Sequence, residues 1–119
     1  MSAPNIVNIS TMYGSTAVQN VLTSPQALVS NPAGSNTVVR VNNLIFSNIN
    51  TTTNVSSTVD IFRTAVAYPV SFNVSVPLNS SLVIIGKDTA IYLQEGDAMR
   101  VYGGISGSLV AVCSYETIS

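Results

Sequence analysis

The side chains that most often do chemistry in proteins are scarce in this chain. Histidine is absent, and lysine and cysteine occur once each, as Lys87 and Cys113. The commonest general base and the commonest transition-metal ligand are therefore missing. A structural zinc site has no adequate ligand set, because it needs several cysteines or histidines. We expect no catalytic residue, no metal and no cofactor.

The serines offer no activated nucleophile. The segment Gly104-Ile105-Ser106-Gly107 lacks the spacing of a nucleophile elbow, and no histidine exists to activate its serine, so it is interpreted as a turn. Lys87 could activate a serine only if it were buried. Its neighbour Asp88 instead favours the charged form of the lysine.

Three carboxylates, Asp88, Glu95 and Asp97, lie close together in sequence on two predicted turns. With backbone carbonyls they could bind calcium, but their spacing matches no calcium loop. A glycosidase needs two carboxylates facing each other across a cleft, and nothing in the spacing supports that. The favoured interpretation is that these are solvated turn acids.

The cysteine and the basic residues also point away from specialised sites. A lone thiol cannot form an internal disulfide, so Cys113 is interpreted as a small buried hydrophobe. The four basic residues are dispersed and the net charge is −1, which offers no basic face for nucleic acid.

Tyrosines are the remaining candidates for a binding surface. Tyr68, Tyr92 and Tyr102 are predicted on the outward faces of successive strands, where amphipathic rings suit a protein interface. Cross-strand packing on a half-covered face explains them equally well. We predict that these three tyrosines are interface residues.

The composition predicts a protein that is built into something larger. The chain has 119 residues, enough for one domain, and is 46% hydrophobic but only 8% charged. So few charges cannot keep a whole surface wet and unassociated. We expect part of the exterior to be covered by copies of the chain or by another protein. We also expect no Sec-type leader and no membrane span, because the apolar runs are too short.

The second half of the chain reads as a series of strands. Val70 to Val76 alternates apolar and small polar residues, which predicts a strand with one dry face. Leu82 to Ile85 is an uninterrupted aliphatic run, typical of a strand covered on both faces. Further strands are predicted at Ala90 to Gln94, Ala98 to Tyr102 and Leu109 to Ile118. A tight turn at Glu95-Gly96-Asp97 joins the first two of these.

The first half is predicted to be extended as well. Ser2 to Met12 is either a strand or an arm, and Thr16 to Leu22 fits a short helical turn as well as the strand we favour. Residues 31–36 hold nearly every turn-forming residue type and form a loop. Strands are expected at Ala27 to Ser30, Thr37 to Asn48 and Val55 to Thr64, with a bulge at Asn42-Asn43 that restores the apolar face of the long one.

Strands without intervening helices predict mainly antiparallel sheets. The expected fold is all-β: a single antiparallel β-sandwich over residues 1–119, jelly-roll-like, with eight or nine strands. Within it, residues 1–36 are either an attachment arm with the first short strands or part of the sandwich. The predicted core consists of Val39, Val41, Val59, Ile61, Val70, Phe72, Val74, Val76, Leu82, Ile84, Ile91, Leu93, Met99 and Val101.

Four motifs of the second half together resemble the pattern of a known protein family. They are Val74-Ser75-Val76-Pro77, the run from Leu82 to Thr89, the run from Ile91 to Asp97, and Val112-Cys113-Ser114-Tyr115-Glu116. From about Val38 onward the chain resembles small virion structural proteins of tailed bacteriophages, especially those of cyanobacteria. The resemblance implies a non-enzymatic particle component that decorates the capsid or belongs to the tail, neck or fibres.

These observations lead to one expectation and two rivals. We expect a capsid decoration protein, located on the virion, that binds other virion proteins as a homo-oligomer such as a trimer, without nucleic acid or membrane. The first rival is a tail, neck or fibre component, including a receptor- or glycan-binding adhesin with Tyr92, Tyr102 and Asp97 as the first residues to test. The second rival, an enzyme, is disfavoured by the missing histidine.

Overall fold

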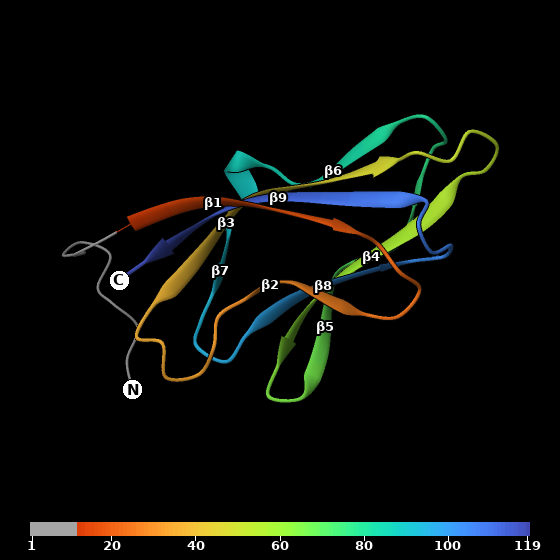
Figure 1. The fold of residues 1–119 in the computed structure, drawn as a ribbon. Coiled ribbons are helices and arrows are strands. Elements are labelled where there is room, and N and C mark those ends of the chain that lie inside the picture. Colours follow the sequence, from red (N-terminus) through yellow and green to blue (C-terminus); the bar gives the residue numbers. More distant parts are fainter. Residues whose placement is uncertain (1–11) are drawn as a thin grey trace.

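The fold is a sandwich of two β-sheets with one short 3-10 turn (Figure 1). The computed structural model describes residues 12–119, apart from the side chain of Lys87. The elements are β1 (Met12–Asn20), β2 (Gln26–Ser30), β3 (Val38–Asn48), β4 (Val55–Arg63), β5 (Val66–Val76), β6 (Ser81–Ile85), η1 (Lys87–Thr89), β7 (Ile91–Leu93), β8 (Ala98–Gly103) and β9 (Leu109–Ile118). The predicted strand or arm at Ser2 to Met12 lies outside the described residues, except for Met12, which begins β1.

The strand order is that of a jelly roll. Sheet A has the order β1-β9-β3-β6, with β7 also paired to β3, and sheet B has the order β2-β8-β4-β5. Every pairing is antiparallel. The chain crosses from one sheet to the other at every connection except β4–β5 and β6–β7, which is the double-sheet arrangement of this fold. The all-β sandwich is confirmed, with nine strands among the described residues.

The core lies between the two sheets and is made of alternate residues from both. Its buried members are Val21, Val29, Val39, Val41, Leu44, Phe46, Val55, Val59, Val76, Ile85, Leu93, Met99, Val101, Leu109, Ala111 and Cys113. Ile61, Leu82, Ile84 and Ile91 pack against this cluster. Eleven predicted core residues are therefore in or against the core, which follows from the alternation of side chains along a strand.

The bulge predicted at Asn42-Asn43 is confirmed. In the pairing of β3 with β9 the register shifts between Val41 and Asn43. Val41 and Leu44 are both buried, although they are three residues apart and would lie on opposite faces of a regular strand. At this bulge the Oδ1 of Asn43 accepts a hydrogen bond from the amide of Ser114.

Three predicted core residues are exposed to solvent. Val70, Phe72 and Val74 of β5 are exposed, Phe72 to 63%. The prediction from alternation was wrong here because β5 is the edge strand of sheet B, and register shifts opposite β4 disturb its faces. Leu82 to Ile85 is likewise not covered on both faces, since it forms β6 at the edge of sheet A and leaves Val83 exposed.

The hairpin between β4 and β5 closes through an unusual two-residue turn. Thr64 and Ala65 both have positive φ, 54° and 61°, between the paired residues Arg63 and Val66. Two positive φ values define the primed turn that suits the twist of a hairpin, and Asn-Gly is its usual sequence. A β-branched threonine there is strained, which is why turn chemistry did not predict this hairpin.

In the described part of the chain, no helix is long and apolar enough to cross a bilayer.

Candidate interaction surfaces

Asp97 anchors the turn between β7 and β8 to the β4–β5 hairpin. Its two carboxylate oxygens accept hydrogen bonds from Nε and Nη2 of Arg63, at 2.8 and 2.6 Å, and it also accepts one from the amide of Gln94. The hydrogen bond from Arg63 lowers the pKa of Asp97, although burial acts in the opposite direction. The interpretation of Asp97 as a solvated turn acid was wrong, because its carboxylate is buried and structural.

Asn31 joins the predicted 31–36 loop to the same turn. Its buried Nδ2 donates to the carbonyls of Thr37 and Leu93, and its Oδ1 accepts from the hydroxyls of Ser35 and Thr37. The backbone of Asn31 exchanges hydrogen bonds with Gly96 and Asp97. Every polar group of this buried amide is satisfied, so the loop is rigidly attached and serves the fold.

A second ion pair lies on the outer face of sheet B. Arg100 donates from Nε and Nη2 to the two oxygens of Asp60, at 2.9 and 3.0 Å, and its guanidinium lies 4.2 Å from the centre of the Phe62 ring. The side chain of Asp60 is only 3% exposed, because Arg100 covers it. The pair holds β8 and β4 together, and both charged groups are neutralised by each other.

The acids do not gather into a metal site. In residues 12–119, no three of the histidine, cysteine, aspartate and glutamate side chains come close enough to hold an ion. Glu95, the acid between Asp88 and Asp97, accepts a hydrogen bond from the amide of Asn36 at 2.6 Å. Asp60 and Asp97 are each engaged by an arginine. The paired acids therefore act as structural clamps.

The three tyrosines predicted to form an interface are not on one surface. Tyr92 lies on β7 of sheet A, whereas Tyr68 and Tyr102 lie on β5 and β8 of sheet B. Tyr68 is paired with Ile61, a residue that packs against the core, so it lies on the inner side of sheet B beyond the covered core. Its predicted outward placement was wrong, because register shifts in β5 exchange the two faces. The role of the three residues in an interface stays a prediction.

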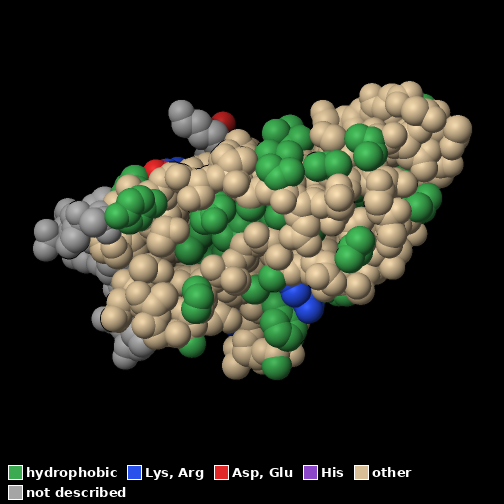
Figure 2. All heavy atoms as spheres, viewed as in Figure 1, with side chains coloured by type: hydrophobic (Ala, Val, Ile, Leu, Met, Phe, Trp, Pro, Cys, Tyr) green, Lys and Arg blue, Asp and Glu red, His purple; other side chains and the backbone are tan. Residues whose placement is uncertain are grey.

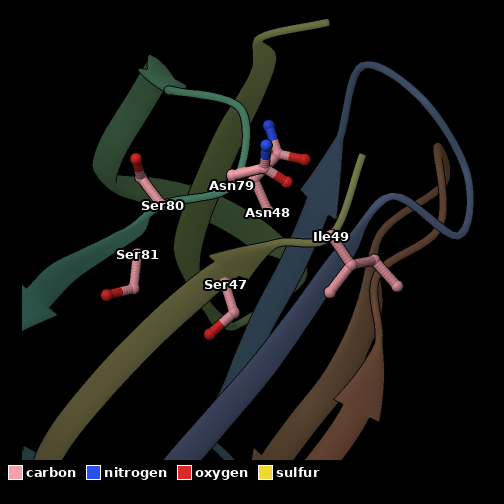
Figure 3. A pocket seen from close by; sticks show the side chains of 6 residues that line it. All are labelled: Ser47, Asn48, Ile49, Asn79, Ser80 and Ser81. Carbon is pink, nitrogen blue, oxygen red and sulfur yellow. The ribbon is translucent and has the colours of Figure 1, made fainter. Parts of the chain in front are cut away.

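An open depression lies where β3 ends beside the start of β6 (Figure 3). It has a volume of about 580 Å³ and is lined by Ser47, Asn48, Ile49, Asn79, Ser80 and Ser81. Figure 3 shows these side chains fanning outward, with Ile49 turned away from the serines. The Asn48 amide is used to hold the loops, since its Nδ2 donates to the carbonyls of Thr53 and Val76. No charged or aromatic group lines the depression, so it offers little to orient a ligand.

The outer face of sheet A carries a row of aliphatic side chains across four strands. Val18 of β1 is paired with Val112 of β9, Val112 with Ile45 of β3, and Ile45 with Val83 of β6. These four residues form the outer row. Val18 is 67% exposed and Val83 is 58% exposed at its two ends. Figure 2 shows apolar side chains gathered along the upper part of the molecule, over β3, β6 and β9 of Figure 1.

Cys113 is buried in the core, as its alternating strand predicted. Burial raises the pKa of its thiol to about 12. We expect iodoacetamide at neutral pH to leave the folded protein unlabelled and to label it fully in guanidinium chloride, as read by intact mass. Thr51→Cys, placed in an exposed loop, is the control and should add one label to the folded protein. Rapid native labelling at Cys113 would contradict its burial.

Comparisons with known proteins identify a fold and no family. No protein family matches the chain, and no curated protein matches it. Among solved structures it is similar to a chain described in "Bacillus endospore appendages form a novel family of disulfide-linked pili". That likeness covers 99% of this chain and 95% of the other, with a TM-score of 0.53 and 9% sequence identity. At this identity the two share a fold, the jelly-roll sandwich, and nothing further follows about activity.

Proposed function

We propose that this chain is a non-enzymatic structural subunit that assembles in many copies on a larger particle, and that the particle is the virion of a tailed bacteriophage. The outer row is the observation that carries the assembly. Its end residues Val18 and Val83 are more than half exposed, and contiguous apolar surface on a soluble protein usually marks an interaction site. The placement on a virion is supported by the resemblance of the sequence motifs.

The chemistry of the surface suits attachment in many copies. Side chains around the outer row are uncharged, such as Thr16, Asn43 and Ser114, which form the neighbouring row across the sheet. Contacts of aliphatic and neutral polar groups are little affected by salt, and many weak contacts to a repetitive lattice add up through multivalency. We place the subunit on the capsid surface, with a tail, neck or fibre location, including an adhesin, as the alternative.

The pilus structure with the same fold suggests a second kind of particle for a subunit of this class. Pili, like capsid decorations, are built from repeated subunits. This chain differs in the state of its cysteine, because Cys113 lies in the core. A disulfide between copies through Cys113 would require the thiol to leave that core, so we propose an assembly held by non-covalent contacts.

Immunogold electron microscopy of particles from lysates that contain this chain tests the proposal. We expect dense, regular labelling of phage heads that persists when NaCl is raised to about 1 M, where screening acts within about 3 Å. Labelling confined to the tail or fibre would select the alternative location. Labelling of filaments on cells would replace the virion with a pilus-like particle. Protein found only in the soluble fraction would contradict the structural role.

A further inference from the structure

Among the described residues, four strands stand at the ends of the two sheets and the three-residue β7 forms a further short edge beside β3. One of the end strands lacks the features that normally protect an edge. β2 and β6 have five residues each and a register shift opposite their partners, and β5 contains Pro69 and two register shifts. β1 has nine residues, with no proline, no charge and no register shift against β9. Long, regular, uncharged edges are templates for pairing with another strand.

The hydrogen-bond phase of β1 directs alternate backbone groups away from β9, where no described residue pairs with them. The amide of Val21 donates to the carbonyl of Leu109, which aligns Val21 with β9. Because the direction of the backbone groups alternates along an antiparallel strand, Gly14, Thr16 and Val18 direct their amides and carbonyls away from β9. Within residues 12–119, β1 pairs on that one side only. The free edge therefore presents a regular series of donors and acceptors.

We propose that two copies of the chain join through β1, antiparallel, so that sheet A of one copy continues into sheet A of the other across a two-fold axis. An antiparallel edge is self-complementary, because each free donor meets a free acceptor of the same strand in the partner. Five residues of β1 have outward groups, so full overlap forms about ten interchain hydrogen bonds. The absence of charge in β1 removes any repulsion between identical strands.

The outer row supports a second copy as the occupant. Val18 stands at the β1 end of that row and is 67% exposed, since no strand of residues 12–119 lies beyond it. A two-fold axis perpendicular to the sheet places the outer rows of both copies on the same side and doubles the apolar surface. This pairing rests on the proposed multi-copy function and names the edge through which two copies meet. The doubled apolar surface of the dimer would then bind the particle.

Two matched lysine variants test the edge. In full overlap Val18 lies opposite Gly14 of the second copy, so Val18→Lys places a lysine on the pairing edge, which is how natural edge strands are protected. Val83→Lys changes the same residue type, on the same face, at the opposite edge of sheet A. Sedimentation over a concentration series should show a dimer of the native chain and of Val83→Lys. For Val18→Lys the dissociation constant should rise at least about tenfold. Equal thermal unfolding of both variants establishes that each is folded.

Amide hydrogen exchange provides the second measurement, and Thr16→Pro the second variant. The amides of Gly14, Thr16 and Val18 should exchange slowly in the dimer and quickly after dilution, while that of Ala17, bonded to β9, stays slow. Thr16→Pro removes a free-edge donor without removing a bond to β9, so it should also weaken the dimer. A dimer broken by Val83→Lys and spared by Val18→Lys would overturn the β1 interface and leave the proposed multi-copy function standing. A monomer whose β1 amides exchange slowly at all concentrations would show that this edge is covered within one copy, and it would overturn the pairing. Immunogold labelling tests the proposed function separately.

Discussion

Replacing Arg100 with leucine is expected to lower the free energy of unfolding by about 3–5 kcal/mol, because it leaves a buried carboxylate without its partner. Arg100 is the hydrogen-bond donor to both oxygens of Asp60, whose side chain is 3% exposed. The change also removes the cation–π contact with Phe62. Chemical denaturation followed by circular dichroism measures the loss.

Arg40→Leu is the matched control for this substitution. Arg40 approaches Glu116 at 3.6 Å, with side chains 36% and 24% exposed, so its ion pair is expected to contribute about 0–1 kcal/mol. The double variant Asp60→Leu/Arg100→Leu should recover most of the stability lost in Arg100→Leu, since no buried charge remains unpaired. Equal losses in Arg100→Leu and Arg40→Leu, or no recovery in the double variant, would refute the burial argument.

Truncating Phe46 to alanine should cost about 3–5 kcal/mol of unfolding free energy. Phe46 lies on β3 in the centre of sheet A, is fully buried and is the largest of the buried side chains. Its removal leaves a cavity between the sheets that neighbouring side chains fill only in part. The same denaturation experiment measures the change.

Phe72→Ala makes the identical change on the exterior. Because Phe72 is 63% exposed on the edge strand β5, its truncation should alter the unfolding free energy by no more than about 0.5 kcal/mol in the isolated subunit. A large loss of unfolding free energy in Phe72→Ala would show that Phe72 belongs to the core, as the alternating sequence around it predicted. A small loss at position 46 would contradict the observed packing.

The contrast between these two phenylalanines shows how far sequence reasoning reaches. Both stand in strands of alternating or near-alternating pattern, and the strand prediction was correct for each. Alternation depends only on neighbours in the chain, so it identifies strands and the bulge at Asn42-Asn43 without tertiary information. Whether a strand lies in the centre or at the edge of its sheet depends on pairings between distant residues, and that decides which apolar face is covered.

The candidate surfaces divide in the same way. Composition alone showed that the chain is poorly charged and has no histidine, and from this we predicted that part of its exterior is covered by copies of the chain or by another protein. The outer row was not foreseen, because Val18, Val112, Ile45 and Val83 come from four strands far apart in the chain and meet only through register. Asp97 was interpreted as a solvated turn acid, and the burial of Asp60 was not foreseen, because their arginine partners are 34 and 40 residues away in the sequence.

The amino-acid sequence by itself determined that this protein is a stack of extended segments with a dry interior and no histidine chemistry, because periodicity and composition are local properties. Only the tertiary structure decided which strands became edges, which acids became buried clamps, and which aliphatic side chains lie side by side on the outside. Those outcomes depend on strand order and register, which are set by the packing of the whole chain at once.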